Sequence, residues 1–373
     1  MRRWRLMRWL TLSLIATLAI VNFSAQPSPG QTLVDTGRFC TVNPEPLENP
    51  QQGRSYGDPH INTYDGVHYS FQTVGEYILS KSEDSSFEVQ ARQQQVVNRN
   101  NLSLNTAVAM NVCGHRVAVY VANIPDGGND QLWIDGMPVP RTDDVVPLDN
   151  GGEVQQLGSG DYGIIWPSGD QVRLKTITVS GSPFINIMPL LRPSHRGQMV
   201  GLIGNFNGNT SDDLMARDGS IVPARSSYSV ATNALARALP AVIPVGEVED
   251  AYFDTLYRQF GDSWRVPAEE SLFDYGPGQS TATFTDLDFP SEFFTLNQVS
   301  PVQVRSSLET CREAGVEEAL LDGCVFDVAA TGEPSFADAA ANAIANELVR
   351  SLRDRLIDEV EDAIDIPIPG FPF

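Results

Sequence analysis

Apolar and polar residues alternate along much of the first half of the chain. The alternation is clearest at 69–79 and 87–91, and it returns at 107–121, where a Cys-Gly-His turn divides two valine-rich runs. Successive side chains of a strand point to opposite faces, so this pattern predicts strands with one buried face. Turn sequences such as Ile-Asp-Gly-Met at 134–137 separate the runs. Short strands joined by such turns predict an antiparallel β-sandwich rather than a parallel α/β sheet.

The pattern changes after residue 191. A loop rich in Gly, Asn and Asp spans 201–219, and residues 276–300 are again loop-like. Several later stretches have the apolar spacing of helices, so a mainly β fold followed by a helical C-terminal region is expected. The predicted helices are 227–238, 248–260, 302–314 and the segment from 334 onward.

The last predicted helix, 335–366, is amphipathic. Ser335 and Asp338 form a capping box at its start. Apolar residues then recur every four positions, which places them on one stripe of the helix. The stripe either packs on its own domain or forms a surface for self-association or another partner. A short apolar tail, 367–373, follows; the stripe contains Ile344, Leu348, Leu352, Leu356, Val360 and Ile364.

The first 25 residues have the organisation of a secretory signal peptide. Four arginines precede an apolar run at 10–21, and a small residue, Ala25, stands before the expected cleavage point. Phe23 is a poor residue for cleavage after Ala25, so an uncleaved anchor is the alternative. The apolar run is shorter than the roughly 18 residues of a spanning helix. We expect an exported protein with no membrane span after signal removal, secreted or, in a bacterium, periplasmic or at the cell surface; 26–53 has linker composition.

The chain contains four cysteines, an even number that suggests two disulfides in an exported protein. Cys311 and Cys324 are close in sequence and are expected to pair. Cys40 and Cys113 remain as the second pair by elimination alone. Because the chain lacks a Cys-x-x-Cys pair, a zinc site built on these residues is not expected.

Acidic residues strongly outnumber basic ones. The 47 Asp and Glu residues against 25 Lys and Arg residues give a net charge of −22 at pH 7. Affinity for nucleic acid comes largely from neutralising phosphates, so this charge argues against a nucleic-acid partner. The same negative charge is compatible with binding of cations.

Three segments in order resemble the von Willebrand factor type D (VWD) domain. The first is Gly-Asp-Pro-His at 57–60, followed by Thr-Tyr-Asp-Gly-Val-His-Tyr-Ser-Phe at 63–71. The second is Gly-Leu-Ile-Gly-Asn-Phe-Asn-Gly-Asn at 201–209, and the third is Phe-Gly-Asp-Ser-Trp-Arg-Val at 260–266. The resemblance covers 54–268 and implies a VWD-type antiparallel β-sandwich. It continues more weakly over 269–334, which resembles the segment that follows VWD domains and implies helices clipped by a disulfide.

Two positions depart from the family pattern. The family usually has Cys where this chain has Glu76 and Ile203. A branched apolar residue at 203 implies a site that is packed rather than cross-linked, so covalent multimers of the mucin kind are not expected.

The loop after residue 204 is a candidate calcium site. Asn205, Asn207, Asn209, Asp212 and Asp213 place five oxygen-bearing side chains within nine residues. Ca²⁺ takes six to eight oxygen ligands, and a tight loop can supply them. The alternative from spacing alone is a turn in which the Asn side chains cap their own backbone.

The resemblance strengthens the calcium interpretation, because VWD domains bind Ca²⁺ in this loop with help from an early Asp. It implies side-chain ligands at Asp65, Asn205, Asn207, Asp212 and Asp213. It also implies that Asn209 offers its backbone carbonyl.

The Asp58-Pro59 bond is a candidate for self-cleavage. In some mucin-type VWD domains the same sequence cleaves itself between Asp and Pro. The Asp58 carboxyl can attack its own carbonyl carbon, proline leaves as the amine, and His60 can act as the proton donor. The alternative is a rigid turn at the first strand, with proline fixing φ.

The sequence as a whole predicts an exported, non-enzymatic, calcium-binding VWD protein that acts in adhesion or extracellular assembly. Protein or glycan partners are expected. The chain has no Gly-x-Ser-x-Gly elbow, phosphate-binding loop or His-Glu-x-x-His motif. A self-processing protein and a purely structural envelope or matrix component are the alternatives.

Overall fold

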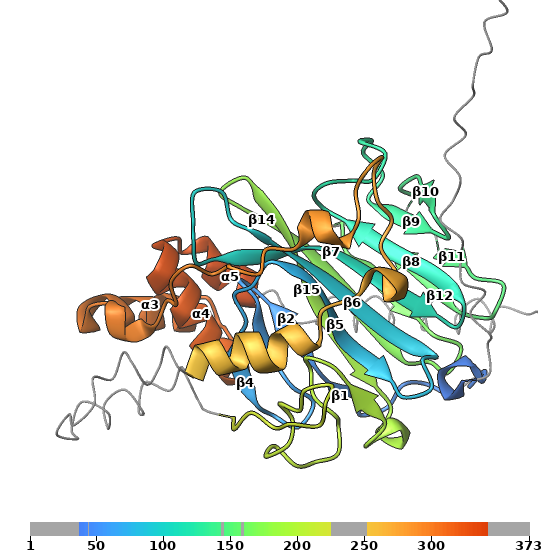
Figure 1. Ribbon diagram of the computed structural model, residues 1–373, viewed down its shortest axis with the longest axis horizontal. Helices are drawn as coiled ribbons and strands as arrows, with labels where there is room; N and C mark the ends of the chain where they lie inside the picture. Colours follow the sequence, from blue (N-terminus) through green and yellow to red (C-terminus); the bar gives the residue numbers. More distant parts are fainter. Residues whose placement is uncertain (1–36, 44, 143–144, 158–159, 225–251, 342–373) are drawn as a thin grey trace, which may run out of the picture. The chain divides into compact units, whose positions relative to one another are not determined.

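Two antiparallel sheets form the body of the protein, as a computed structural model shows (Figure 1). The structure describes residues 37–43, 45–142, 145–157, 160–224 and 252–341. The predicted signal peptide, the predicted helix at 227–238, the start of the one at 248–260 and residues 342–366 of the last predicted helix lie outside these residues. The predicted antiparallel, mainly β architecture is confirmed.

The first sheet has nine strands in the described residues. Five strands between residues 145 and 191 lie side by side in the order of the sequence. The last of these five also pairs with a strand from the start of the domain, at residues 54–56, and two further early strands follow it in the sheet. The strands, in order, are β11 (Val145–Pro147), β12 (Glu153–Gln156), β13 (Tyr162–Ile165), β14 (Gln171–Val179), β15 (Ser182–Leu191), β2 (Arg54–Tyr56), β3 (His60–Asn62) and β4 (His68–Ser70), with β1 (Gln51–Gln52) also on β15.

The second sheet has seven strands in the described residues. Its long strands, at 75–82, 87–95 and 103–112, are buried on both faces, so the expectation of one buried face is wrong for them. The segment that carries Leu272 and Phe273 packs on the face away from the main core. Two of its hairpins use two-residue turns, at Cys113-Gly114 and Asp135-Gly136, in which both residues have positive φ. That geometry matches the right-handed twist of the flanking strands. The strands are β10 (Met137–Val139), β9 (Leu132–Ile134), β8 (His115–Tyr120), β7 (Ser103–Val112), β6 (Phe87–Gln95), β5 (Gly75–Ser82) and β16 (Met199–Val200).

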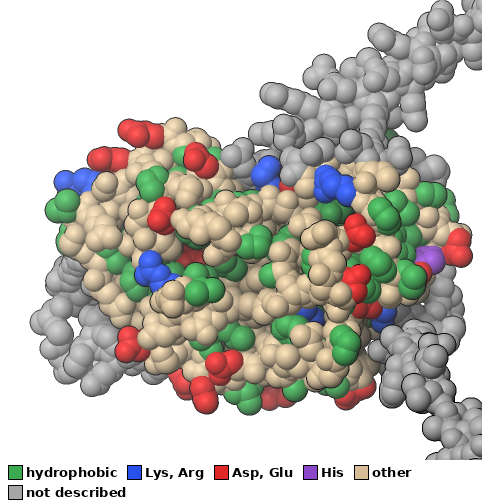
Figure 2. Space-filling view, turned by 90° about the horizontal axis from the view of Figure 1, so that it is seen from above, with side chains coloured by type: hydrophobic (Ala, Val, Ile, Leu, Met, Phe, Trp, Pro, Cys, Tyr) green, Lys and Arg blue, Asp and Glu red, His purple; other side chains and the backbone are tan. Residues whose placement is uncertain are grey.

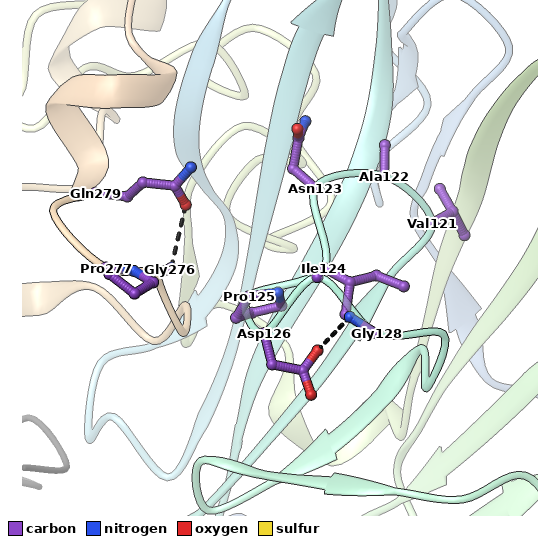
Figure 3. Close-up of a pocket in the computed structure, with 11 residues that line it drawn as sticks. Val121, Ala122, Asn123, Ile124, Pro125, Asp126, Gly128, Gly276, Pro277 and Gln279 are labelled. Atoms are coloured by element: carbon purple, nitrogen blue, oxygen red, sulfur yellow. Dashed lines mark hydrogen bonds between the residues drawn. The ribbon is translucent and has the colours of Figure 1, made fainter. Parts of the chain in front are cut away.

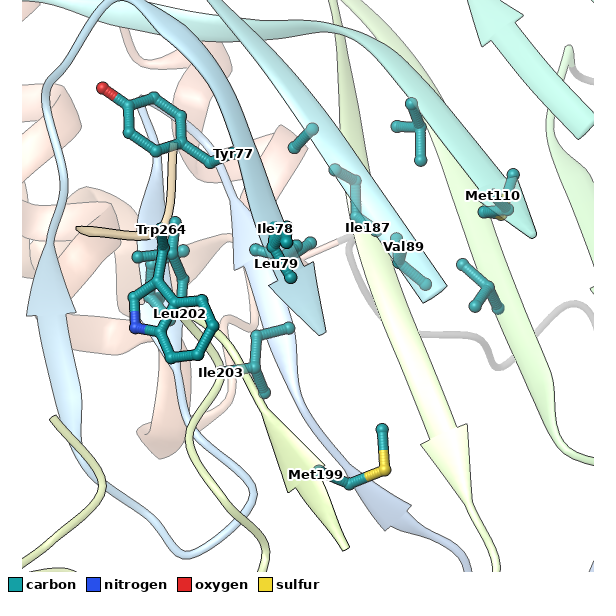
Figure 4. Close-up of a cluster of buried hydrophobic side chains, with 14 of the residues drawn as sticks. Tyr77, Ile78, Leu79, Val89, Met110, Ile187, Met199, Leu202, Ile203 and Trp264 are labelled. Atoms are coloured by element: carbon teal, nitrogen blue, oxygen red, sulfur yellow. The ribbon is translucent and has the colours of Figure 1, made fainter. Parts of the chain in front are cut away.

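The main core contains apolar side chains from both sheets and from the later loops (Figure 4). Ile203 is fully buried in it, beside Leu202 and in the same cluster as Trp264. The prediction that position 203 is packed rather than cross-linked is therefore confirmed. A π-helical turn, η3 (Thr255–Gly261), adds Leu256 and Phe260 to the same core.

A small helical subdomain follows the sandwich. It consists of α3 (Pro301–Glu313), α4 (Glu318–Thr331) and α5 (Ser335–Ala341), which lie together in Figure 1. Its apolar residues share a second core with side chains of the first sheet, including Tyr56 and Phe184. The described residues also contain short 3₁₀ helices, which are η1 (Arg38–Cys40), η2 (Pro193–His195), η4 (Ala268–Glu270), η5 (Thr281–Phe284) and η6 (Leu296–Gln298).

Both expected disulfides are present. Cys311 joins Cys324 between α3 and α4. Cys40 joins Cys113, and this bond ties η1 to the turn between β7 and β8 across 73 residues of sequence.

Candidate functional site

The predicted calcium loop and the turn that carries Asp65 lie against each other. Asp65 comes after β3, and its Oδ2 accepts a hydrogen bond of 2.8 Å from the backbone N–H of Asn207. The side-chain amides of Asn205 and Asn207 both donate to the carboxylate of Asp212, at 3.2 and 3.0 Å. The fold thus brings together residues that are about 140 positions apart in the sequence.

Asp213 is the buried member of this cluster. Its side chain is only 1% exposed, and its Oδ2 accepts a 2.6 Å hydrogen bond from the Thr63 hydroxyl. Its other oxygen, Oδ1, is buried with no hydrogen-bond partner among the described residues. The pKa of Asp213 is raised to about 6, mainly because the carboxyl group is buried. The hydrogen bond from Thr63 lowers this pKa, and the nearby carboxylates of Asp65 and Asp212 raise it further.

These observations fit a hard cation. A buried carboxylate oxygen without a partner is costly unless a ligand satisfies it. After burial, the charges of Asp65 and Asp212 also raise the pKa of Asp213, and a divalent ion would offset this unfavourable proximity of carboxylates. The chemistry of the donor set, oxygens only, is the kind that Ca²⁺ selects.

The capping alternative is also visible in the loop. Asn205 and Asn207 accept hydrogen bonds from the backbone N–H two residues later, at 3.2 and 2.7 Å. Asn209 Oδ1 accepts from both the N–H and the hydroxyl of Ser211. The side-chain oxygens of all three Asn residues thus accept hydrogen bonds within the turn, and the backbone carbonyl of Asn209 accepts a long one, of 3.5 Å, from the N–H of Asp212.

Glu76, the second position that departs from the family pattern, forms a buried ion pair. Its carboxylate lies 2.7 Å from Nε of Arg92, and both side chains are fully buried. The Arg92 guanidinium lies 3.6 Å from the ring centre of Phe284 and 4.5 Å from that of Phe273. An ion pair in an aromatic cage thus occupies this position and holds the segment after the sandwich against β5 and β6.

The Gly-Asp-Pro-His segment lies in a buried, charged cluster. His60 Nε2 is 2.7 Å from Oδ1 of Asp58 and also contacts Oδ1 of Asp327, and each of these side chains is at most 2% exposed. Burial lowers the pKa of His60, but the charges of Asp327 and Asp58 outweigh it and raise that pKa to about 10. Burial and the charge of Asp58 raise the pKa of Asp327 well above its usual range.

Asp327 is the residue that sequence reasoning missed. It lies on α4, 267 positions from His60, and no short motif connects the two. The sequence contains one indirect signal: Cys-Val-Phe-Asp-Val at 324–328 belongs to the stretch that resembles the segment C-terminal to VWD domains.

A shallow cavity of about 560 Å³ lies where residues 121–128 face the turn at 276–279 (Figure 3). The carboxylate of Asp126 accepts from Gly128 N–H at 2.8 Å, and Gln279 accepts from Gly276 N–H at 3.1 Å. These polar groups stabilise their own turns, and we assign no ligand to the cavity.

The charged side chains on the surface agree with the composition. On the face shown in Figure 2, Asp and Glu side chains are scattered and Lys and Arg side chains are isolated. Within the part of the chain that the structure describes, no helix is both long and apolar enough to cross a membrane.

Residues 53–220 match the family model of the von Willebrand factor type D domain. The antiparallel sandwich and the Gly- and Asn-rich loop at 201–209 agree with this match. The chain carries a VWD domain.

Several curated proteins are similar to this chain. Sushi domain-containing protein 2 from Homo sapiens is 26% identical over 314 residues, which cover 80% of this chain and 33% of that protein. Mucin-5B from Homo sapiens is 28% identical over 208 residues, 54% of this chain and 3% of that protein. Zonadhesin from Oryctolagus cuniculus is 30% identical over 184 residues, which cover 46% of this chain and 7% of that protein.

The chain therefore spans only a third or less of the length of these three relatives. The alignment with the first extends beyond the VWD match into the rest of the chain. The two disulfides of this chain are of the kind that persists outside the cell, which agrees with the expected export.

Proposed function

We propose that this chain is a calcium-stabilised VWD module that acts in adhesion or extracellular assembly, without enzymatic turnover. The observation that carries the calcium part is the buried Oδ1 of Asp213, which lacks a partner among the described residues and lies in a cluster with Asp65 and Asp212. Relatives named as mucins and zonadhesin support the assembly role. Proteins or glycans outside the cell are the proposed partners, and self-association through 335–366 is a further route.

The calcium part is tested by thermal unfolding in millimolar Ca²⁺ and in excess EDTA. We expect a higher melting temperature with Ca²⁺, because an ion that binds only the folded state stabilises it by mass action. Extracellular calcium modules bind at about 10⁻⁴–10⁻³ M, so millimolar ion is required. Asp213→Ala should abolish the difference.

Two further variants complete this experiment. Asp213→Asn keeps the shape of the side chain and serves if the alanine variant does not fold. Asp288→Asn, a change at an exposed carboxylate outside the loop, is the matched control and should respond to Ca²⁺ as the unmodified protein does. An identical melting curve in Ca²⁺ and in EDTA would reject the calcium site.

A second function, self-processing between Asp58 and Pro59, has its own support. His60 lies 2.7 Å from Asp58 in a buried site, and its raised pKa favours the imidazolium, which is a proton donor. The Asp58 carboxylate attacks the carbonyl carbon of its own residue, the C–N bond to Pro59 breaks, and the proline nitrogen takes the proton from His60. Water then opens the cyclic anhydride left at Asp58 to two carboxyl groups.

Self-processing is tested by incubating the purified chain near pH 5 and separating the products on reducing gels. We expect two fragments, the second of which begins at Pro59 by mass spectrometry. Asp58→Ala removes the nucleophile and should leave the chain intact. Persistence of the full-length chain under all conditions would reject this second function.

A further inference from the structure

Helix α4 contributes a third ionisable side chain, Asp327, to the site formed by Asp58 and His60. Asp327 lies on this helix, in the subdomain that follows the sandwich, and its Oδ1 forms a hydrogen bond with Nε2 of His60. The contact is fully buried on both sides. Asp327 lies outside residues 53–220, which the VWD family model matches, whereas His60 lies within them.

The two carboxylates do not play the same part around His60. Asp327 forms the hydrogen bond to Nε2. Asp58 Oδ1 lies 2.7 Å from the same nitrogen, so both carboxylates contact Nε2, and both raise the pKa of His60. A single N–H donates well to one acceptor at a time. Asp58 carries the scissile bond to Pro59 and Asp327 does not, so Asp327 is the acceptor that can hold the ring while the Asp58 carboxylate reacts.

The close approach of α4 to this site depends on a residue without a side chain. A Cβ added at Gly323 would lie 2.5 Å from the Tyr56 hydroxyl and 2.8 Å from Cδ2 of His60. Such distances require the helix or the ring to move. Glycine at 323 thus permits the helix to dock closely enough for Asp327 to reach His60.

Other charged and titratable groups surround the cluster. Arg54 on β2 forms an ion pair of 3.6 Å with Glu317, the residue that precedes α4. Tyr56 on β2 and Asp322 on α4 also interact electrostatically with members of the cluster, and His68 on β4 acts on Asp322. Arg54 and Glu317 form a second contact between sandwich and helix, at the edge of the buried site.

We propose that Asp327 is a positioning residue for the Asp58–Pro59 reaction: it holds His60 oriented as the proton donor, so the site is complete only when the helical subdomain has docked on the sandwich. This inference rests on the self-processing function proposed above. The bonds made and broken are those given there, and Asp327 neither forms nor breaks a covalent bond. Self-processing would then occur after folding of the C-terminal subdomain rather than precede it.

The test compares the rate at which fragments appear in the full chain and in Asp327→Asn. We expect a loss of about 100-fold or more, the scale of general acid catalysis. Asp327→Glu, which keeps the carboxylate, should recover part of the rate. Asp338→Asn, at an exposed position on α5, is the matched control and should cleave at the unmodified rate.

A second readout separates positioning from mere folding. The pKa of the His60 ring, followed by NMR, should fall in Asp327→Asn and stay unchanged in Asp338→Asn. Gly323→Ala keeps all three ionisable side chains but pushes α4 away from the ring, and it should also slow cleavage. This variant carries the test if Asp327→Asn does not fold.

The two possible failures are distinguishable. A folded Asp327→Asn protein that cleaves at the unmodified rate, with the His60 pKa unchanged, overturns the role of Asp327 and leaves self-processing standing. An unmodified chain that stays intact across the pH range overturns the self-processing function, and the role of Asp327 falls with it.

Discussion

The proposed calcium binding should depend on pH through Asp213. Its pKa in the folded protein is raised from an ordinary value of 3.8 to about 6, first by burial and then by neighbouring carboxylates. The folded chain without calcium therefore holds this proton more tightly than the unfolded chain does. The resulting stability is fully present below the unfolded pKa and is lost as the pH rises through about 6. A bound Ca²⁺ ion would replace the proton at neutral pH.

This linkage predicts that protons and Ca²⁺ compete for Asp213. The gain in melting temperature on adding Ca²⁺ should be larger near pH 7.5 than near pH 5, because protonated Asp213 binds the ion poorly. Differential scanning calorimetry at the two pH values measures the gain. In Asp213→Asn the gain should vanish at both. A gain that is independent of pH in the unmodified protein would show that Asp213 is not a ligand.

The ion pair of Glu76 with Arg92 predicts a large effect of breaking it. Arg92→Met leaves the Glu76 carboxylate buried without its cation, and removing one partner of a buried pair costs about 3–5 kcal/mol. Denaturant unfolding measures the change in the free energy of unfolding. The double variant Glu76→Met with Arg92→Met should recover part of the loss, since no uncompensated charge remains. A double variant less stable than Arg92→Met would contradict this account.

At the residue scale, the sequence predicts contacts that are local. The loop ligands Asn205, Asn207 and Asp212 are recognisable because they lie within a few positions of one another. Asp65 is predicted as a ligand only from the resemblance to the VWD family. In the structure its carboxylate accepts a hydrogen bond from the backbone N–H of Asn207. Asp327 could not be predicted, because its contact with His60 depends on how α4 docks on the first sheet.

At the element scale, the hairpins result from local chemistry, whereas the order of the strands does not. Alternation and Asp-Gly or Cys-Gly turns are sufficient to predict β7, β8, β9 and β10. The pairing of β15 with β2 joins segments about 130 residues apart, and nothing in either segment specifies the other. Such pairing depends on burial in the assembled core, so it appears only in the structure.

The disulfide between α3 and α4 belongs to this scale as well. Cys311 and Cys324 close a loop of 13 residues, and a loop of this size contributes about 3 kcal/mol in the chain-entropy model. The double variant Cys311→Ala with Cys324→Ala should therefore lower the stability of the helical subdomain first. Native-state hydrogen exchange should show faster exchange in α3 and α4 than in β6 and β7. Equal acceleration in the sandwich strands would show that the two parts unfold as one unit.

At the scale of the whole molecule, the net charge of −22 has a partial structural explanation. Asp65, Asp212 and Asp213 converge on one loop, and Asp58 and Asp327 converge on His60. The first cluster suits a divalent cation, and in the second the His60 imidazolium offsets part of the negative charge. Most of the other acidic side chains that the structure describes are exposed or half-buried, where they favour solubility.

The central claim is that the VWD module binds calcium through Asp213 and its neighbours. Isothermal titration of the calcium-free chain with millimolar Ca²⁺, at neutral pH, tests it most directly. We expect saturable binding of about one ion per chain with a dissociation constant of about 10⁻⁴–10⁻³ M. This binding should be absent in Asp213→Asn and unchanged in Asp288→Asn. Failure of the unmodified chain to bind Ca²⁺ at these concentrations, or equal binding by Asp213→Asn, would contradict it.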